Sequence, residues 1–273
     1  MNIKTIDRLK ILFSVYGVVW YLPRLKSVFG TLFRPADSTR YTEFSYLQKF
    51  LKLKNLTGMD VLDVSSPHLM AYILAKHSHV TKTNIDLSEK KFIRENKNLI
   101  FKQEDAVNLS FFDNRFDLVY SISVIEHIYS KYVQAVQEMI RVAKPGGYVY
   151  LTFPVAKEHR EEWREGEVYS HQYKERGQTF FQYRFSRADV EEMLGRLPAV
   201  RVVCKDIFWE KEEGLYDSMI SKIRRNIANN LVGFVKNSWT NFFYGFTLFD
   251  QNSEYSFARA KSFGNTHIIL QKI

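Results

Sequence analysis

Acidic side chains follow successive segments that have the pattern of buried strands, and this placement is suited to binding a ribose. Asp63 closes an apolar run at 61–64, and Asp86 closes the next such segment, 23 residues further on. An acid at the end of the second strand of an α/β unit can accept hydrogen bonds from both ribose hydroxyls. Asp105 follows a third segment and can accept from an exocyclic amine. Taken singly, Asp86 is as consistent with a capping residue, and Asp105 is better explained as a turn residue.

The segment after Asp63 combines a sharp turn with a helix start. Ser66 and Pro67 are suited to be the N-cap and the first residue of a helix. A helix N-terminus presents unpaired N–H groups and a partial positive charge, so it favours a carboxylate. In an open α/β sheet, this edge, outside the carboxyl ends of the strands, is where ligands bind.

Strand and helix patterns alternate from residue 60 to residue 153. The expected strands are 60–65, 79–86, 98–103, 116–121 and 148–153, and the expected helices are 67–76, 89–97 (capped by Ser88) and 129–143. This alternation predicts a parallel sheet with helices on both faces, and right-handed crossovers place the strand ends on one edge. Further elements are expected towards the C-terminus: a helix at 187–196 capped by Ser186, a strand at 199–205, a turn at Gly264-Asn265 and a last strand at 266–273.

Two kinds of segment flank or interrupt this pattern. Residues 1–57, with ten Lys/Arg and three Asp/Glu, are expected to form an N-terminal helical cap. The remainder, 58–273, is one domain with a charged lid insertion at 157–180 and an aromatic helical insertion at 212–250. The first helix has an apolar face, made of Ile6, Leu9, Phe13, Tyr16 and Trp20. We expect this helix to cap the main domain; contact with an anionic membrane is the alternative.

Composition restricts the class of protein only loosely. The net charge of +9 permits phosphorylated substrates, nucleic acid or anionic lipid and selects none of them. A single cysteine, Cys204, excludes an internal disulfide framework, and it is expected in the core. The apolar run at 11–22 is too short to span a membrane, and no cleavage site follows it. We therefore expect a cytoplasmic protein without a metal site, with peripheral membrane contact left open.

Residues 59–154 resemble a class I S-adenosylmethionine-dependent methyltransferase of the small-molecule, type 11-like kind. The motifs that carry the resemblance are VLDV at 61–64, IDLSEK at 85–90, QEDAVNLSFFDNRFDLVYSISVIEHI at 103–128 and EMIRVAKPGGYVYLTFP at 138–154. The resemblance implies a Rossmann-like sheet of seven strands. This sheet would be mostly parallel with an antiparallel last strand, and helices would cover both faces.

The resemblance also assigns residues to the cofactor, S-adenosylmethionine. Asp63 would lie by the methionine end, Asp86 on the ribose, Asp105 with Ala106 at the adenine amine, and Ser121 and Ile122 beneath the sulfonium. The other residues assigned to the cofactor are Ser65, Ser66, Pro67 and Leu87. Glu126 and His127 match a Glu-His pair that faces the substrate in some relatives. His127 is our first candidate for a general base, with Glu126 as its partner; the alternative is a packed histidine.

Other residues are weaker candidates for the same edge. His171 and Tyr173 in the inserted lid have the reach. Tyr41 and Glu43, just before the sheet, are expected to be solvated helix residues; the alternative is that they close the pocket from the other side. His267, inside an apolar strand, is expected to lie in the core.

The chain departs from the family where a glycine-rich loop is expected. Ser65, Pro67 and Leu69 occupy the three glycine positions. Glycine permits a positive φ and a close approach of backbone to ligand. A sulfonium amino acid has no pyrophosphate, so a phosphate cradle is not required, and we expect binding to be retained. The alternative is a closed pocket.

The favoured function is methyl transfer, by O-methylation, to a small-molecule, sugar or lipid-linked acceptor. The alternative is a non-catalytic, methyltransferase-like binding or scaffold protein. Nucleic-acid methylation is disfavoured because the loop at 121–124 lacks an Asn/Asp-Pro-Pro-aromatic run. A nicotinamide-dependent dehydrogenase is disfavoured because a pyrophosphate needs the missing glycines.

Overall fold

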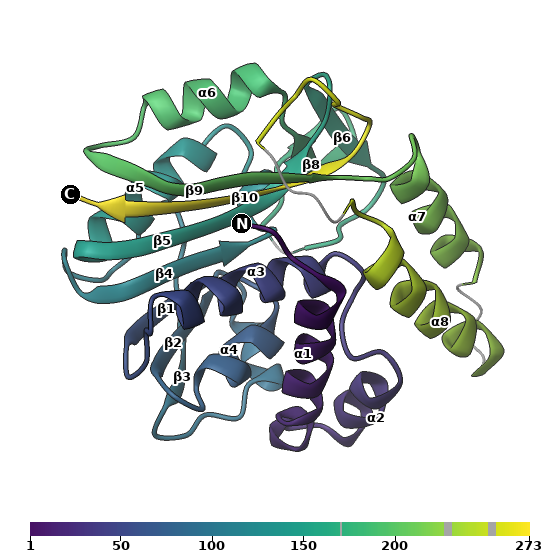
Figure 1. Ribbon diagram of the computed structural model, residues 1–273, viewed down its shortest axis with the longest axis horizontal. Coiled ribbons are helices and arrows are strands. Elements are labelled where there is room, and N and C mark those ends of the chain that lie inside the picture. The colour runs from purple at the N-terminus through teal and green to yellow at the C-terminus, as the bar shows by residue number, and fades with distance from the viewer. Residues whose placement is uncertain (170, 227–230, 251–254) are drawn as a thin grey trace.

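A computed structural model shows a seven-stranded sheet with helices on both faces (Figure 1). It describes residues 1–169, 171–226, 231–250 and 255–273. The strand order is β3-β2-β1-β4-β5-β10-β9. The strands are β1 (Asp60–Val64), β2 (His79–Asn84), β3 (Leu99–Gln103), β4 (Phe116–Ile122), β5 (Ala143–Val155), β9 (Val200–Trp209) and β10 (Gly264–Lys272). Strands β1 to β5 pair in parallel, and β10 pairs antiparallel with both β5 and β9. The expected fold, with its antiparallel last strand, is confirmed.

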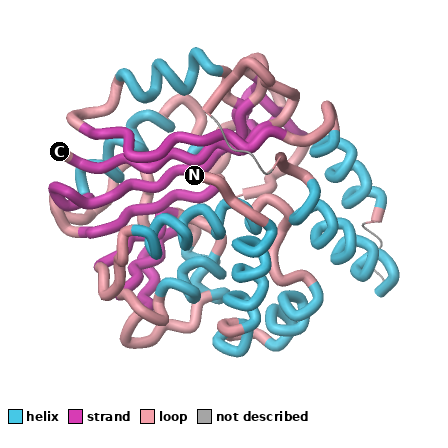
Figure 2. Tube along the Cα trace, viewed as in Figure 1, coloured by secondary structure: helices cyan, strands magenta, loops and turns pink. Residues whose placement is uncertain are grey.

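Neighbouring residues of each inner strand face two separate cores. Val61 packs with helices α1 (Thr5–Tyr16), α3 (Arg40–Leu53) and α4 (His68–Leu74), whereas Leu62 packs with α5 (Tyr132–Val142) and α6 (Arg187–Gly195). On α5 the buried residues recur at helical spacing: Val133, Val136, Met139 and Ile140. Ser186 caps α6 as expected, because its hydroxyl accepts from the Asp189 N–H. Figure 2 shows these helices on the two sides of the strands.

Several expected boundaries were wrong. Pro67, not Ser66, occupies the N-cap of α4, and Asp86, not Ser88, is the N-cap of the 3-10 helix η2 (Leu87–Phe92). Gly264 and Asn265 lie inside β10 rather than in a turn before it, because both pair with β5 and β9. Cys204 lies on β9 and is partly exposed.

The segment expected as a lid forms a small antiparallel sheet at the edge where β5 ends. Its strands are β6 (Arg160–Arg164), β7 (Lys174–Glu175) and β8 (Gln178–Arg184), in the order β6-β8-β7. Arg184 anchors the sheet, since its guanidinium contacts Glu162 and Asp217, each at 2.7 Å. One charged residue of the expected lid, Glu162, therefore takes part in an ion pair that holds the insertion in place.

The remaining helices lie at the carboxyl edge of the parallel strands and beside α3. They are α2 (Leu25–Phe33), α7 (Leu215–Arg225) and α8 (Leu231–Thr247), with the 3-10 turns η1 (Val19–Tyr21) and η3 (Ile125–His127). Figure 1 shows α7 and α8 side by side at that edge. Among the described residues, no helix has the length and apolar character needed to cross a membrane.

Gly245→Ala should destabilise the protein. A Cβ at this position of α8 would lie 2.8 Å from Cε2 of the fully buried Tyr41 and nearer still to Cδ2. Overpacking of this kind costs about 1–3 kcal/mol, which exceeds the stabilisation expected from the higher helix propensity of alanine. Chemical denaturation should show a lower free energy of unfolding.

Gly30→Ala is the matched control, because its Cβ would meet nothing within 4 Å on α2. This variant should be as stable as the wild type or more so, by up to ~1 kcal/mol. Equal effects of the two substitutions would contradict the packing of α8 on Tyr41.

Candidate active site

The ends of four parallel strands lie level with one another. Val64 pairs with Thr83, Asn84 with Gln103, and Asp63 with Tyr120. Asp86 and Asp105 each lie two residues beyond the paired Asn84 and Gln103. The register therefore brings the acids that follow β2 and β3 to the same edge as the turn after β1.

Asp63 is fully buried and has partners within the protein. Its carboxylate lies 3.3 Å from Nζ of Lys82 and accepts from the Tyr120 hydroxyl at 2.7 Å and the Ser66 N–H at 2.8 Å. Burial raises the pKa of Asp63, and Lys82 and Tyr120 oppose that rise. Lys82 also donates to the carbonyl of Ser66. Lys82 was not among the expected site residues; the pairing of β1 with β2 places it beside Asp63.

The turn after β1 keeps the backbone shape of a glycine turn without a glycine. Ser65 has φ of +56°, in the left-handed region that glycine adopts at no cost. The hydroxyl of Ser66 accepts from the Ile122 N–H at 2.9 Å, so it serves β4 and not the helix. Because α4 has only seven residues and no side-chain cap, we assign no carboxylate site to its N-terminus.

The residues expected around the adenosine lie at the edge that they were assigned to. Asp86 accepts from the Ser88 N–H at 2.8 Å, and the side chain of Leu87 beside it is exposed. Asp105 is exposed and accepts from the Val107 N–H at 3.0 Å, which is the turn role considered for it. Ala106 next to it is buried.

Ser121 and Ile122 end β4 at the centre of this edge. Both are buried, and the Ser121 hydroxyl has no hydrogen-bond partner in the structure. An unpaired buried hydroxyl is costly unless something else satisfies it. This orphaned oxygen is suited to a ligand at the end of β4.

A buried carboxylate, Glu43 on α3, joins the N-terminal helices to the same edge. One of its oxygens accepts from Ser123 at 2.7 Å, Thr152 at 2.8 Å and Asn265 at 3.1 Å, and Arg40 binds the other. Burial opposes ionisation of Glu43, but Arg40 and these hydrogen bonds outweigh it and lower its pKa.

The expectation that Tyr41 and Glu43 are solvated was wrong, since both are fully buried. Glu43 lies three, four and seven residues before the buried Tyr46, Leu47 and Phe50. That spacing is the signal that places it on the inner face.

Glu126 and His127, in η3 beside β8, are both held neutral. Burial raises the pKa of Glu126 to about 8, and its Oε2 has no hydrogen-bond partner. Burial lowers the pKa of His127 to about 4, and Arg40 and Arg164 act in the same direction. Nδ1 of His127 lies 2.5 Å from the Phe181 carbonyl, so this nitrogen carries the proton and Nε2 is left as an acceptor. Nε2 lies 3.9 Å from the Glu126 carboxyl.

The remaining candidates from the sequence, His171, Tyr173 and His267, lie apart from this pair. His171 is exposed, and Tyr173 stacks on Tyr129 with ring centroids 4.1 Å apart. His267 lies in the core as expected, 2.9 Å from the Tyr150 hydroxyl.

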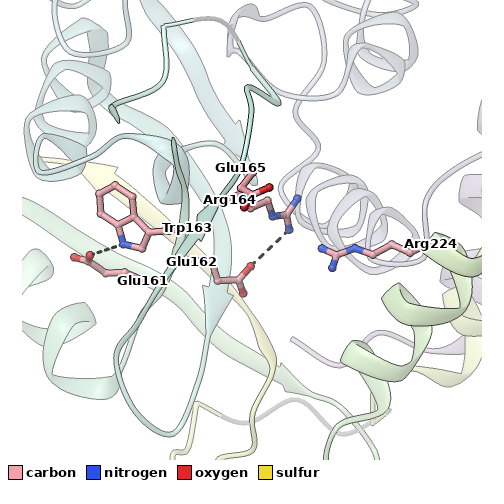
Figure 3. Close-up of a pocket in the computed structure, with 6 residues that line it drawn as sticks. All are labelled: Glu161, Glu162, Trp163, Arg164, Glu165 and Arg224. Atoms are coloured by element: carbon pink, nitrogen blue, oxygen red, sulfur yellow. Dashed lines mark hydrogen bonds and ion pairs between the residues drawn. The ribbon is translucent and has the colours of Figure 1, made fainter. Parts of the chain in front are cut away.

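An open cavity of about 780 Å³ lies between the small sheet and α7 (Figure 3). Arg164 of β6 and Arg224 of α7 point towards one another across it, and three glutamates also line it. The Arg164 guanidinium stacks on the Phe181 ring, which also contacts His127. The cavity is therefore connected to the Glu126–His127 pair through one aromatic side chain. Among the described residues, no group of His, Cys, Asp and Glu is arranged to hold a metal ion.

Comparisons with known proteins agree with this geometry. Residues 62–151 match a family described as a methyltransferase domain. A curated phthiotriol/phenolphthiotriol dimycocerosates methyltransferase 1 from Mycobacterium ulcerans is 33% identical over 104 residues. That match covers 36% of this chain and 38% of the relative, so most of the relative's length lies outside it.

Two solved structures share the fold at low sequence identity. Coclaurine N-methyltransferase, bound to N-methylheliamine and SAH, aligns with a TM-score of 0.52 and 15% identity over 85% of this chain and 73% of that one. The [4+2]-cyclase SpnF aligns with a TM-score of 0.50 and 16% identity over 83% and 80% of the two chains. At such identities the likeness concerns the fold alone.

Glu126→Gln should stabilise the protein increasingly as the pH rises. Between pH 4.5 and 8 the folded wild type retains a proton on Glu126 that the unfolded chain loses. Wild-type stability therefore falls in this window by up to about 1.4 kcal/mol per pH unit, and glutamine removes that penalty. Urea unfolding of both proteins across pH 5–8 measures the difference.

Glu43→Gln is the control of opposite sign. The pKa of Glu43 is lowered, so its contribution to stability is present above its ordinary value of 4.5 and is lost as the pH falls. This variant should be less stable than the wild type at pH 7. A pH-independent effect of Glu126→Gln would show that Glu126 is ionised in the folded protein.

Proposed function

We propose that this chain, which carries a class I S-adenosylmethionine-dependent methyltransferase domain, transfers a methyl group to a small-molecule or lipid-linked acceptor. One observation carries the proposal: the register of four strands brings Asp86, Asp105 and the unpaired hydroxyl of Ser121 to one edge. The domain match begins inside β1 and ends inside β5, so it covers the strands that form this edge.

The residues present fit the adenosine end of the cofactor. Asp86 would hold the ribose hydroxyls, and the exposed Leu87 would cover one face of the adenine. Asp105 would accept from the adenine amine, with Ala106 beside it. Ser121 and Ile122 would lie below the sulfonium, where the Ser121 hydroxyl lacks a partner.

The methionine end is more restricted. Asp63, Ser65, Ser66 and Pro67 would surround it, with the left-handed Ser65 in place of a glycine. Lys82, however, already supplies a positive charge to Asp63 and a hydrogen bond to the Ser66 carbonyl. An amino-acid ammonium therefore finds no unpaired acid there. We expect most of the binding free energy to come from the adenosine end.

The acceptor side supports O-methylation. Bound S-adenosylmethionine supplies an electrophilic methyl group on its sulfonium. Neutral His127 keeps its Nε2 lone pair available to receive the hydroxyl proton of an acceptor. Protonated Glu126 can donate from its unpaired oxygen to the same acceptor and orient it. Positioning of this kind lowers the barrier of a two-substrate reaction by roughly 7–11 kcal/mol.

The alternative is a methyltransferase-like protein that binds a ligand without transferring a methyl group. Lys82 beside Asp63 and the glycine-free turn favour it. The fold is also found in a protein described as a [4+2]-cyclase, so it does not by itself dictate the reaction. The unpaired oxygens of Ser121 and Glu126 favour the catalytic function, because a site without a ligand gains nothing from leaving them unsatisfied.

We place the protein in the cytoplasm, with its N-terminal helix in peripheral contact with a membrane. The relative from Mycobacterium ulcerans is described as acting on phthiotriol dimycocerosates, and this supports a lipid-linked acceptor.

Asp86→Ala should abolish binding of S-adenosylmethionine and leave the fold intact. Ligand at about 100 times its dissociation constant stabilises the wild type by ~2.7 kcal/mol, which thermal unfolding detects readily. Without ligand the variant should unfold at a modestly lower temperature than the wild type, because it loses the bond from the Ser88 N–H that caps η2. It should show no shift when ligand is added.

Glu192→Ala, an exposed change on α6, should keep the full shift. A shift of wild-type size in Asp86→Ala would exclude the assigned edge. No shift in any of the three proteins at millimolar ligand would favour the non-catalytic alternative.

A further inference from the structure

We propose that α1, η1, α2 and α8 together form a surface that docks on an anionic lipid bilayer. The surface extends the contact proposed for the N-terminal helix to a helix more than 200 residues away in the chain. It also extends the proposed function, because it names the membrane as the source of the acceptor. The statement about the acceptor rests on the proposed function, whereas the docking of the surface on a bilayer does not.

Large apolar side chains gather on these four elements without being covered. Six of them have exposed fractions of 59–70%: Phe13, Trp20, Phe29, Phe33, Trp239 and Phe243. Such side chains mark an interaction surface when they are clustered rather than scattered. The apolar face of α1 was expected to cap the main domain, but Phe13 and Trp20 of that face point outwards. Ile11 and Val15 of α1 enter the core instead.

On α2 and on α8, the exposed apolar side chains form a single stripe along the helix. On α2, Leu25, Phe29 and Phe33 recur every four residues. On α8, Val235, Trp239 and Phe243 recur in the same way. Residues at this spacing lie on the same side of a helix. An apolar stripe outside the core is the pattern of a helix that lies in a membrane interface.

Contacts between the helices make the two stripes parts of one surface. The Tyr16 hydroxyl of α1 donates to the Leu32 carbonyl of α2 at 3.1 Å, and the Phe33 ring of α2 meets the Phe234 ring of α8 with centroids 6.1 Å apart. The buried Arg8 of α1 donates to the Phe246 carbonyl near the end of α8 at 3.1 Å. Figure 1 shows α1, α2 and α8 along the same side of the molecule.

The charge of the two segments favours an anionic bilayer over other occupants. Residues 9–36 contain four Lys/Arg and no Asp/Glu, and residues 218–249 contain four Lys/Arg and no Asp/Glu. A second copy of the chain would bring these cations against one another, whereas anionic headgroups complement them. Phe and Trp side chains are suited to the boundary between headgroups and acyl chains.

The docked orientation would bring the open cavity near the bilayer. Arg224, which lines the cavity, lies in the last turn of α7, and α7 packs on α8 through the Lys222 contact with the Tyr244 hydroxyl at 2.9 Å. A lipid could therefore enter between α7 and the small sheet. The acceptor class that this favours is a membrane lipid.

Co-sedimentation of the full chain with vesicles tests the docking surface. The wild type should bind vesicles of phosphatidylglycerol and phosphatidylcholine at least ten-fold more tightly than vesicles of phosphatidylcholine alone, and binding should weaken as salt rises. Intrinsic fluorescence should shift to the blue, because Trp20 and Trp239 enter an apolar medium. Phe29→Ser combined with Trp239→Ser should reduce binding at least ten-fold.

Phe112→Ser is the matched control, since Phe112 is 84% exposed but lies on the loop between β3 and β4. It should bind as the wild type does. Wild-type binding by the double variant, or no preference for anionic vesicles, would overturn the proposal. So would a dimer in light scattering that the double variant abolishes, because the occupant would then be a second copy.

The thermal shift with S-adenosylhomocysteine, measured on the same proteins without vesicles, separates this inference from the proposed function. Vesicle binding without a shift supports the docking surface and counts against methyl transfer. A shift without vesicle binding supports methyl transfer and counts against the docking surface.

Discussion

The structure depends on the complete satisfaction of one buried carboxylate. Glu43 is ionised with no exposed surface, and a charge in that position is stable only when several partners surround it. Its partners come from α3 itself, from the residue after β4, from β5 and from β10. Moving any of these elements removes a partner from the buried carboxylate. Helix α3 is thereby fixed to the ends of the central strands.

The two halves of the proposed site differ in how their carboxyl groups are neutralised. On the proposed cofactor half, the buried Asp63 is balanced by Lys82, and Asp105 after β3 is exposed. On the proposed acceptor half, Arg40 pairs with the ionised Glu43. Glu126, close by, stays protonated because burial raises its pKa more than Arg40 lowers it. One ionised and one neutral carboxylate in the same buried environment provide a fixed charge and a hydrogen-bond donor. The arrangement suits an acceptor hydroxyl placed between Glu126 and His127.

Local sequence patterns were sufficient for the strands from β1 to β5, for the presence of a last strand and for the Ser186 cap, since each is determined by an apolar run or a turn beside it. The antiparallel direction of the last strand was implied by the family resemblance. They failed where the deciding partner is distant in the chain. Glu43 is buried by Thr152 and Asn265, which lie 109 and 222 residues away. The Ser66 hydroxyl accepts from the Ile122 N–H instead of capping its own helix, because strand pairing places the Ile122 N–H within reach. The charged segment after β5 folds as a sheet because Arg184 pairs with Glu162 across it. The roles assigned to individual site residues stay predictions.

Hydrogen exchange with and without S-adenosylhomocysteine tests the central claim most directly, namely that the ends of β1 to β4 form a cofactor edge coupled to the Glu126–His127 segment. We predict slower exchange on ligand addition in residues 63–68, 84–88, 105–107 and 121–127. Amides of α6, which contributes none of the assigned site residues, should be unchanged. Unchanged exchange in all four segments at saturating ligand, or protection confined to another part of the molecule, would contradict the account.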